Sequence, residues 1–495
     1  MNQNFVVSIL EDENDGDFSA GDLSLREAIA LANETEGADT IVFDESLNGG
    51  TITFDESSDR ELIINDSVAI QGLGQDNLTL DGGFIFDVAV NVDFALDGLN
   101  IIRGKIDNSG NLTFNNSTIS QTINFDNPGD NGADNSAIIS RGRAVISDSS
   151  IVDNSSNFAG NTGVFIESGT AIIEQSTIAD NTAISVSGIT IGDDATVDLI
   201  NSTVANNLGR SFGGIDNDGS LNVVNSTVAN NVTFSRGGEQ VGQINNAGNT
   251  KLTSSIVASN NDSSLTELSG DGEYVSGGNN LISNGDNVSG FVDSDLVGTA
   301  DNPIDPQLGE LQDNGGSTPT QPLQEGSPAI NAGSNPNNLE TDQRGEGFER
   351  TVGDSTDIGA FEVQESTLGS EIRGTNGDEL SGTVDNDVIF GLAGNDTLTG
   401  GNGGDTIDGG SGDDLVTGGD NNDIFVLNTE GGIDTISDFG NGNDLLGLPE
   451  EISFGDLSFS GSEIIFGDST LAVLDLFDTT TLTESDFVSG DFLSI

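Results

Sequence analysis

Hydrophobic and polar residues alternate along the chain in three successive patterns, and the first predicts a helix. In LSLREAIALANE the apolar residues Leu25, Ala28, Ile29 and Ala32 recur at helical spacing on one face. Ser24 and Glu27 have the spacing of a capping box at the start of this segment. We therefore expect residues 1–39 to contain a strand and a short amphipathic helix that caps a larger β core.

The second pattern consists of short β-rich runs separated by Gly, Asp and Asn, such as TIVF, TITF and ELIIN. A related phrase then recurs, for example as EQSTIADN, INSTVANN and VNSTVANN. Its apolar marks lie 32, 27, 26, 24 and 28 residues apart, at Ile119, Ile151, Ile178, Val204, Val228 and Ile256. This period is typical of a solenoid rather than of a globular sheet.

The repeat unit contains short strands and no helical stretch, so successive turns must stack strand on strand in parallel. We predict a right-handed parallel β-helix over residues 40–300, with the handedness that parallel crossovers prefer. Asn residues follow the strands, where a tight bend tolerates left-handed backbone and where side chains can stack into ladders. They are Asn154, Asn181, Asn206, Asn207, Asn230 and Asn231.

Six of the eight prolines lie between Pro303 and Pro336, which predicts that the regular coils end there. Residues 301–363 are expected to close the β-helix, and residues 364–372 to form a short linker.

The third pattern has a period of nine residues and runs from Arg373 to Leu427. The sixth place of every row is aspartate, at Asp378, Asp387, Asp396, Asp405, Asp414 and Asp423. The eighth place is apolar, at Leu380, Ile389, Leu398, Ile407, Val416 and Phe425. The first place is glycine in five rows, and Arg373 breaks that column.

This spacing predicts a parallel β-roll around Ca²⁺ over residues 373–427, followed by a cap over residues 428–495. Glycine permits the tight turn and exposes carbonyl oxygens, aspartate supplies a hard anionic oxygen, and the apolar residue points inward. Ca²⁺ prefers six or more oxygen ligands, so rows stacked two places apart must share an ion, which allows about four interior sites. Without Ca²⁺ the aspartates would stack like charges, so folding is expected to depend on binding.

Composition supports a cation partner and excludes others. The chain has 83 acidic and 12 basic residues, a net charge of −71, which opposes compaction unless cations neutralise part of it. The same charge repels nucleic acid and anionic membrane surfaces. The absence of Cys and His excludes disulfides, tetrahedral zinc sites and thiol nucleophiles. We expect no membrane-spanning segment and see no N-terminal signal of the Sec type.

Rows such as GLAGNDTLT and GGSGDDLVT resemble the hemolysin-type (RTX) calcium-binding repeat family. The resemblance implies Ca²⁺ as cofactor, export of a bacterial protein by type I secretion machinery, and an extracellular location, either secreted or at the cell surface. The ending LTESDFVSGDFLSI fits an uncleaved C-terminal signal. The implied metal ligands are the six aspartates Asp378, Asp387, Asp396, Asp405, Asp414 and Asp423. Turn glycines would add backbone carbonyls, at Gly382, Gly391, Gly394, Gly400, Gly403, Gly409, Gly412 and Gly418.

The first domain resembles proteins with an N-terminal CSLREA motif, matched by LSLREAIALAN with Leu23 in place of the cysteine. The segments SPAINAGSN, TDQRG and DIGAFE are similar to the "choice-of-anchor Q" domain. These resemblances imply an extracellular, pectate-lyase-like β-helix. They imply no particular activity, because the family is defined by its architecture.

Two functions stay open for the β-helix. A polysaccharide lyase needs Arg or Lys beside carboxylates, and the coils contain only a few bases, namely Arg103, Lys105, Arg141, Arg143, Arg210, Arg236 and Lys251. A glycoside hydrolase needs a carboxylate pair, which 83 acidic residues supply by chance. The absence of Trp and the single Tyr274 disfavour a carbohydrate groove.

We therefore assign no catalytic residue and expect a calcium-binding structural or adhesin-like protein. Its candidate partners are an extracellular polysaccharide and a cell-surface matrix. An extracellular polysaccharide lyase or glycoside hydrolase is the alternative.

Overall fold

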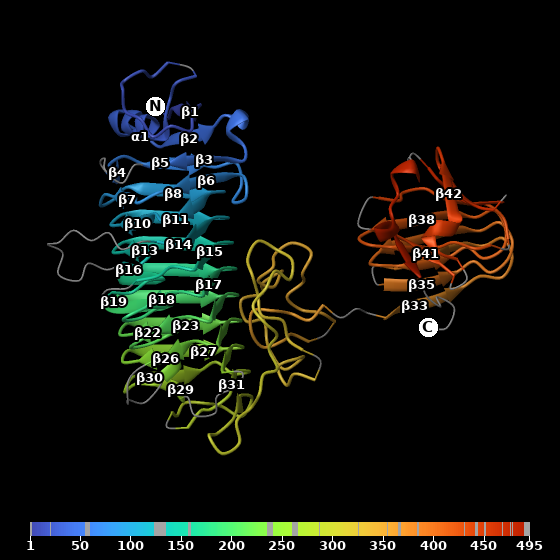
Figure 1. The fold of residues 1–495 in the computed structure, drawn as a ribbon. Helices are drawn as coiled ribbons and strands as arrows, with labels where there is room; N and C mark the ends of the chain where they lie inside the picture. The colour runs from blue at the N-terminus through green and yellow to red at the C-terminus, as the bar shows by residue number, and fades with distance from the viewer. Residues whose placement is uncertain are drawn as a thin grey trace. The chain divides into compact units, whose positions relative to one another are not determined.

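The computed structural model divides into two compact units, Met1–Val363 and Gln364–Ile495, which are described separately. It describes residues 2–489 apart from 20, 55–59, 123–134, 157–159, 235–240, 260–265, 287, 325, 354, 365–367, 384–385, 430, 441–443, 450–451, 468, 476 and 478. Nearly all regular structure in these residues is parallel β-strand, as predicted (Figure 1). The one α-helix among them is α1 (Leu25–Glu34).

The first unit is a parallel β-helix with three strand ladders, of which A and B belong to one 18-stranded sheet and C to an 11-stranded sheet. Ladder A contains β1 (Asn4–Val7), β2 (Asp39–Phe43), β5 (Val68–Gln71), β8 (Asp93–Asp97), β11 (Asn111–Asn115), β14 (Arg143–Ser147), β23 (Ser220–Val224), β27 (Asn249–Thr253) and β30 (Glu273–Ser276). Ladder B contains β4 (Glu61–Ile64), β7 (Ile85–Val88), β10 (Lys105–Asn108), β13 (Ile138–Ser140), β22 (Ile215–Asn217), β26 (Val241–Asn246) and β29 (Thr266–Ser269). The long strands β16 (Val164–Glu174) and β19 (Ile189–Ile200) run through both ladders.

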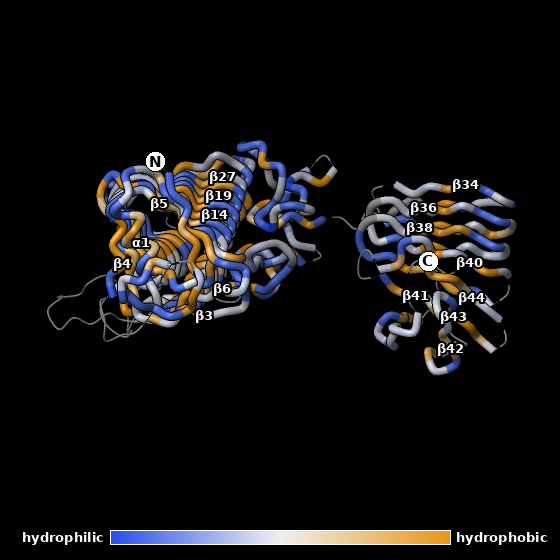
Figure 2. The backbone as a smooth tube through the Cα atoms, turned by 90° about the horizontal axis from the view of Figure 1, so that it is seen from above, coloured by the Kyte–Doolittle hydropathy of each residue, from blue (hydrophilic) through white to orange (hydrophobic). Residues whose placement is uncertain are grey.

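Ladder C contains β3 (Gly50–Thr53), β6 (Leu78–Asp81), β9 (Asn100–Ile102), β12 (Thr118–Ser120), β15 (Ser150–Val152), β17 (Thr177–Ala179), β20 (Thr203–Ala205), β24 (Thr227–Ala229), β28 (Ile256–Ala258), β31 (Leu281–Ile282) and β32 (Leu296–Val297). A short three-stranded sheet adds β18 (Thr182–Ala183), β21 (Leu208–Gly209) and β25 (Val232–Thr233). The strands bury their apolar side chains in one continuous core. Figure 2, seen from above, shows hydrophobic and hydrophilic positions along the backbone of the stacked coils.

The predicted helix covers the N-terminal end of this core. Both hydrogen bonds of the capping box between Ser24 and Glu27 are present. The apolar face of α1 is buried, with Leu25, Ala28 and Ile29 no more than 3% exposed. The helix therefore shields the first coil from water, as a cap on a repeat structure must.

The apolar marks of the repeat stack in one inward column of ladder C. Ile119 pairs in register with Ile151, which is followed by Ile178, Val204 and Val228. The last predicted apolar position, Ile256, is wrong by one residue, because Val257 is the residue that pairs with Val228 in the inward column. Ile256 points outward and packs in a separate apolar cluster with residues of the closing segment, so both neighbours are buried.

The predicted asparagine ladder is present beside this column. The side-chain amide of Asn154 donates to Oδ1 of Asn181 at 2.9 Å, Asn181 donates to Asn207 at 2.9 Å, and Asn207 donates to Asn231 at 2.8 Å. The residues before these positions, such as Asn206 and Asn230, have left-handed backbone with φ of 57° and 59°. An amide both donates and accepts, so the buried column satisfies itself without an ion.

The segment 301–363 lies along the outward side of ladder C. Thr177 Oγ1 donates to the carbonyl of Pro319 at 2.6 Å, and Thr203 Oγ1 donates to Gln343 Oε1 at 2.6 Å. Asn225 Nδ2 donates to the carbonyl of Ser334 at 2.7 Å. These contacts leave ladders A and B as the faces of the coils that the segment does not cover.

The second unit has two ladders that alternate along the chain. One contains β33 (Leu368–Arg373), β35 (Asn386–Phe390), β37 (Thr406–Asp408), β39 (Ile424–Val426), β41 (Leu445–Leu448) and β45 (Phe487–Ser489). The other contains β34 (Glu379–Ser381), β36 (Thr397–Asn402), β38 (Leu415–Asp420), β40 (Asp434–Ile436), β44 (Ser469–Leu474), β43 (Glu463–Phe466) and β42 (Leu457–Ser460). Four single 3₁₀ turns complete the described elements: η1 (Glu45–Leu47) in the first unit, and η2 (Phe454–Asp456), η3 (Thr479–Thr481) and η4 (Glu484–Asp486) in the second.

Candidate calcium site

The aspartates of the nine-residue rows form two stacked columns, because each row pairs with the row two places later. One column contains Asp378, Asp396 and Asp414, and the other contains Asp387, Asp405 and Asp423. In each column Oδ1 of an aspartate accepts the backbone N–H of the aspartate 18 residues earlier. The distances for Asp405, Asp414 and Asp423 are 2.7, 2.8 and 2.8 Å. The columns therefore keep one carboxylate oxygen occupied and leave the other available.

The available oxygens are buried. The row aspartates Asp387, Asp396, Asp405, Asp414 and Asp423 are no more than 2% exposed, whereas Asp378 in the first row is half-buried. One carboxylate oxygen of each of these five aspartates has no hydrogen-bond partner among the described residues. A buried anionic oxygen without a partner is strongly destabilising unless a cation or a proton compensates it. The columns thus have the chemistry of a cation site.

The first glycine of a row leaves the space into which these oxygens project. A Cβ atom at Gly400 would lie 2.1 Å from Asp405 Oδ2 and 2.4 Å from the carbonyl oxygen of Gly418. The same convergence of a carboxylate and a carbonyl occurs at Gly382 and Gly391. Gly394, Gly403 and Gly412 in the fourth place have left-handed φ of 102°, 113° and 140°. Oxygen ligands of both kinds suit Ca²⁺, so the residues present fit this ion.

Stacking also perturbs the acidity of these groups. Burial, together with repulsion from the Asp387 carboxylate, raises the pKa of Asp405 to about 6. Burial, together with repulsion from Asp405, raises the pKa of Asp423 to about 7. In both cases the main cause is burial, which disfavours the charged form of the carboxyl group, and neighbouring carboxylates add to it.

Residues that the sequence analysis did not single out continue both columns. Asp434 Oδ1 accepts the backbone N–H of Asp414 at 3.2 Å, and Asp444 Oδ1 accepts that of Asp423 at 3.0 Å. The spacings are 20 and 21 residues instead of 18, because residues 427–428 and Asp438 interrupt the period. The stretches TEGGIDTIS and FGNGNDLLG nevertheless have aspartate in sixth place and an apolar residue in eighth, which was the available signal.

A glycine substitution distinguishes this site from the rest of the unit. We expect Gly400→Ala to weaken Ca²⁺ binding about 10- to 100-fold, because the added methyl group would displace both Asp405 Oδ2 and the Gly418 carbonyl. Calorimetric titration would measure the change. Gly455→Ala is the matched control, since its Cβ would meet no atom closer than 3.9 Å. Equal binding by both variants would contradict this geometry.

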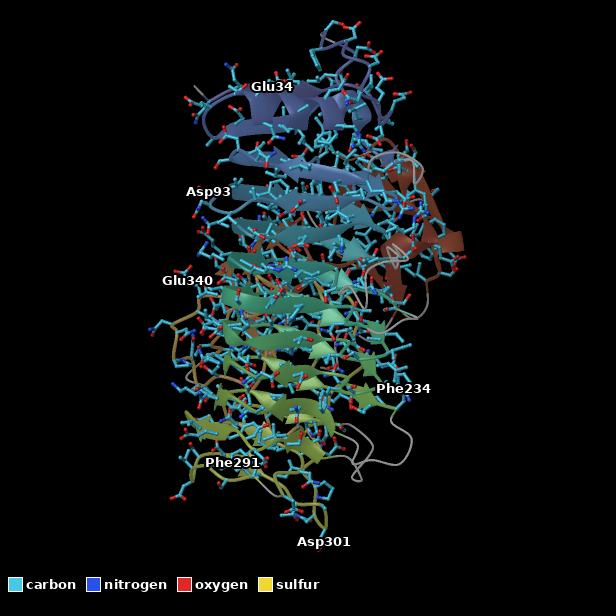
Figure 3. All side chains as sticks on the ribbon, turned by 90° about the vertical axis from the view of Figure 1, so that its left-hand side faces the viewer. Glu34, Asp93, Phe234, Phe291, Asp301 and Glu340 are labelled. Atoms are coloured by element: carbon cyan, nitrogen blue, oxygen red, sulfur yellow. The ribbon has the colours of Figure 1, made fainter. Side chains whose placement is uncertain are left out.

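The bases of the coils are mostly paired. Arg103 Nε lies 2.7 Å from Asp81, and Arg141 bridges Asp107 and Glu167. Lys105 is buried, Arg210 and Lys251 are exposed, and Arg236 lies outside the described residues. Arg143 borders a hollow of about 430 Å³ on ladder A that is also lined by Thr113, Ala95 and Asp93. Figure 3 shows Asp93 among the outward side chains of an early coil.

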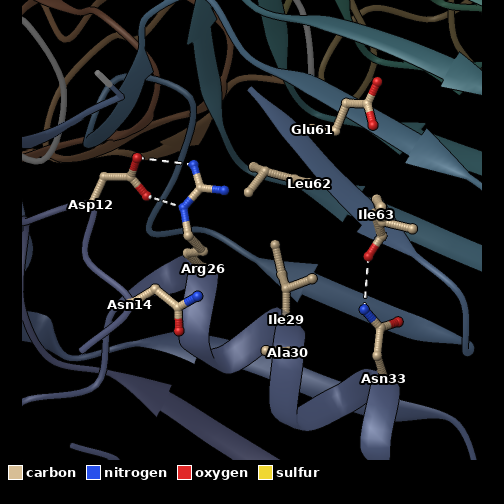
Figure 4. A pocket seen from close by; sticks show the side chains of 9 residues that line it. All are labelled: Asp12, Asn14, Arg26, Ile29, Ala30, Asn33, Glu61, Leu62 and Ile63. Carbon is tan, nitrogen blue, oxygen red and sulfur yellow. Dashed lines mark hydrogen bonds and ion pairs between the residues drawn. The ribbon is translucent and has the colours of Figure 1, made fainter. Parts of the chain in front are cut away.

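A second hollow, of about 340 Å³, lies between α1 and β4 (Figure 4). Arg26 forms two hydrogen bonds with Asp12, at 2.8 and 2.9 Å, and Asn33 Nδ2 donates to the carbonyl of Ile63 at 2.7 Å. These contacts hold the helix against the first coils. Because the guanidinium is already neutralised by Asp12, the hollow has the features of a structural joint rather than of an anion site.

Comparison with known proteins agrees with the C-terminal geometry. The RTX calcium-binding nonapeptide repeat matches residues 373–407 and 399–436, in four copies. The second unit carries RTX calcium-binding repeats. The match to these RTX repeats ends at residue 436 and therefore includes Asp434 but neither Asp438 nor Asp444. No curated protein matches the sequence of the chain.

Two solved structures are similar to the chain. The crystal structure of pectate lyase Pel9A is 15% identical, with a TM-score of 0.38, over 73% of this chain and 96% of that one. The PL6 family alginate lyase AlyGC is 10% identical, with a TM-score of 0.21, over 95% of this chain and 88% of that one. None of the described helices is long and apolar enough to cross a membrane.

Proposed function

We propose that the chain is an exported structural protein whose RTX repeats fold around Ca²⁺ and whose β-helix serves as an adhesin-like surface. One observation carries the calcium part: each of the row aspartates Asp387, Asp396, Asp405, Asp414 and Asp423 has a buried carboxylate oxygen without a partner among the described residues. The ligands would be Asp378, Asp387, Asp396, Asp405, Asp414 and Asp423, with the carbonyls of the turn glycines named above. When bound, Ca²⁺ would supply the positive charge that the columns lack.

The residues around the ligands link ion binding to folding of the roll. The Oδ1 contacts to backbone N–H groups orient each carboxylate, so the second oxygen already points toward the glycine turn. The inward column of Ile389, Leu398, Ile407 and Val416 is buried only when the rows stack. Neutralising the aspartates therefore permits the stacking that buries the apolar column, which links ion binding to folding.

Calorimetric titration of the full chain with Ca²⁺, followed by circular dichroism, tests this proposal. We expect binding of several ions and a gain of β-signal. Asp405→Asn removes one ligand charge and should lower the affinity, whereas Asp475→Asn, an exposed position in the same unit, should not. Absence of binding, or equal effects of the two substitutions, would refute the calcium part of the proposal.

Apparent Ca²⁺ affinity is expected to rise with pH. Without the ion, the raised pKa values of Asp405 and Asp423 let the folded roll hold protons that the unfolded chain has lost. That stability is present below the ordinary aspartate pKa and is lost as the pH rises through about 6 and then about 7. Ca²⁺ must displace these protons, so titrations should show weaker binding at about pH 5 than at about pH 8. An unchanged affinity over this range would contradict the assignment.

Export and adhesion rest on weaker support than calcium binding. The RTX repeats, the net charge of −71 and the resemblance of the first unit to CSLREA proteins favour an extracellular location and type I export. An acidic, repetitive coil surface favours multivalent contact with a polysaccharide or a cell-surface matrix, bridged by calcium. We expect deletion of residues 428–495 to abolish export, and loss of the first unit to reduce adhesion of cells to matrix. Unchanged export after deletion of residues 428–495 would reject the export part of the proposal. Unchanged adhesion after loss of the first unit would reject the adhesin part.

The hollow beside Arg143 is the observation that favours a second candidate, cleavage of a polysaccharide on the β-helix. Its described lining combines Arg143 with the carboxylate of Asp93 and small residues. Its described lining presents no exposed aromatic face, because Phe94 is 1% exposed, and Tyr274 is 7% exposed with its hydroxyl donating to the carbonyl of Ser269. We expect no release of sugar ends from acidic polysaccharides. Release that Arg143→Ala abolishes would instead establish the enzyme.

A further inference from the structure

The strand ladders of the RTX roll continue beyond the sixth row. β38 pairs in parallel with β40, and β39 with β41, so that Val416 lies beside Ile436 and Phe425 beside Leu446. Ile436 and Leu446 are 2% and 0% exposed. Two further rows therefore stack on the array and extend its apolar column.

The aspartates of these rows repeat the contact that defines the columns. Asp434 and Asp444 are each 6% exposed, and each accepts the backbone N–H of the aspartate two rows earlier. Asp444 also accepts the N–H of Gly440 at 2.8 Å. Their carboxylates thus occupy the positions of row aspartates, although the residues between them and the array break the period of nine.

Asp438 contacts the first glycine of the sixth row in a different way from that seen in two earlier rows. There Gly382 donates its N–H group to the carbonyl of Thr399, and Gly391 donates to the carbonyl of Asp408. Gly418 and Gly419 instead donate to Asp438 Oδ1 and Oδ2, both at 2.9 Å. A negatively charged carboxylate therefore stands where the regular rows place a neutral carbonyl.

The Asp438 carboxylate lies beside Gly418, where an oxygen of Asp423 has no hydrogen-bond partner among the described residues. A Cβ atom at Gly418 would lie 2.2 Å from Asp423 Oδ2, an oxygen that is buried and has no partner among the described residues. Asp423 Oδ2 and the carboxylate of Asp438 thus both lie next to Gly418, and Asp444 accepts the backbone N–H of Asp423, although the three carboxylates do not all lie within 4.8 Å of one another without an ion. The other aspartate column ends at Asp434, which is in register with Ala472 of β44.

We propose that the calcium-binding roll has eight rows, and that Asp438 and Asp444 hold an ion together with Asp423 at its C-terminal end. The proposal rests on calcium binding by the aspartate columns and assigns residues beyond the repeat match, which stops at residue 436. Because the number of charged ligands sets Ca²⁺ affinity, this terminal site binds more tightly than the interior sites, which pair one carboxylate with a carbonyl.

Calorimetry and equilibrium dialysis of the full chain with Ca²⁺ alone test this inference. Asp438→Asn and Asp444→Asn should each weaken the tightest class of sites about tenfold or more, and Asp475→Asn should leave it unchanged. If Asp405→Asn lowers the affinity but Asp438→Asn and Asp444→Asn do not, the terminal site is refuted and the interior columns stand. If Asp405→Asn also has no effect, the proposed calcium function itself fails.

A charge-conserving variant separates binding from folding. Asp438→Asn keeps one acceptor for the glycine N–H groups, and Asp438→Glu keeps the charge. Circular dichroism at saturating Ca²⁺ should show folded β-structure for both, with higher affinity for the glutamate variant. Equal loss of β-signal in both would show that the position serves the turn alone, and would overturn the inference.

Discussion

Removal of calcium is expected to unfold the second unit and to leave the first unit folded. The roll stacks aspartates whose available oxygens are buried and unpaired, so the ion-free columns carry uncompensated charge. Each ion present at about 100 times its Kd adds about 2.7 kcal/mol of stability, and several ions together contribute as much as the whole stability of an ordinary domain. Circular dichroism and limited proteolysis with EGTA should show cleavage confined to residues after 363.

Magnesium provides the control for this result. Mg²⁺ demands near-octahedral geometry and loses its water reluctantly, so it should not restore the roll at concentrations at which Ca²⁺ does. Simple screening of the charge of −71 would make the two ions equivalent. Protection of the second unit in EGTA, or equal rescue by both ions, would contradict folding around specific sites.

Both units stack polar side chains in a buried column, but the side chains are asparagines in the first unit and aspartates in the second. In the β-helix, Asn181 donates its amide to Asn207 and accepts from Asn154, so the column is closed and neutral. In the roll, the Asp405 carboxylate accepts from the backbone N–H of Asp387 but has no donor of its own, so only the backbone N–H of Asp405 reaches the next aspartate. Substituting an acceptor-only anion for an amide makes the second column dependent on a cation. We therefore expect calcium dependence in the part of the chain with the aspartate period.

The sequence was sufficient to predict the structure of those parts of the chain in which residues repeat. The period of the apolar marks predicted parallel coils, and the asparagines after the strands predicted the ladder that joins Asn154 to Asn231. Ile256 was misplaced because Val257 beside it is equally apolar, and only the closing segment packed on Ile256 decides which of the two points outward. The aspartates of the nine-residue rows lie in two columns because alternate rows pair, which follows from the half-coil geometry of each row.

Features without a period could not be found in this way. Asp434 follows an insertion of two residues, Asp438 is itself an inserted residue, and Asp444 follows both insertions. These residues therefore fall out of a strict nine-residue count, although strands β40 and β41 pair in register with the array. The closing segment has no repeat, and its contacts join positions more than 100 residues apart, such as Thr203 and Gln343. Contacts of that kind depend on the tertiary fold and leave no local signal.

Arg350 at the centre of the closing segment is the other position where a large effect is expected. Its side chain is 0% exposed, and Nη2 donates to Glu362 Oε2 and to the carbonyl of Asp357, both at 2.8 Å. Nη1 donates to the carbonyl of Gly359 at 2.9 Å. The guanidinium therefore compensates the buried carboxylate and holds together the backbone that covers ladder C.

We expect Arg350→Ala to destabilise the first unit by about 3–5 kcal/mol, because Glu362 would remain buried without its cation. Burial already raises the pKa of Glu362 to about 7, and Arg350 opposes this rise. Without Arg350 the pKa would rise further, so stability held by the protonated acid at low pH is lost as the pH increases. Denaturant unfolding should thus show a larger deficit at about pH 8 than at about pH 5. Arg143→Ala, which removes an exposed guanidinium, is the control, and equal effects of the two substitutions would show that the buried ion pair does not secure the closing segment.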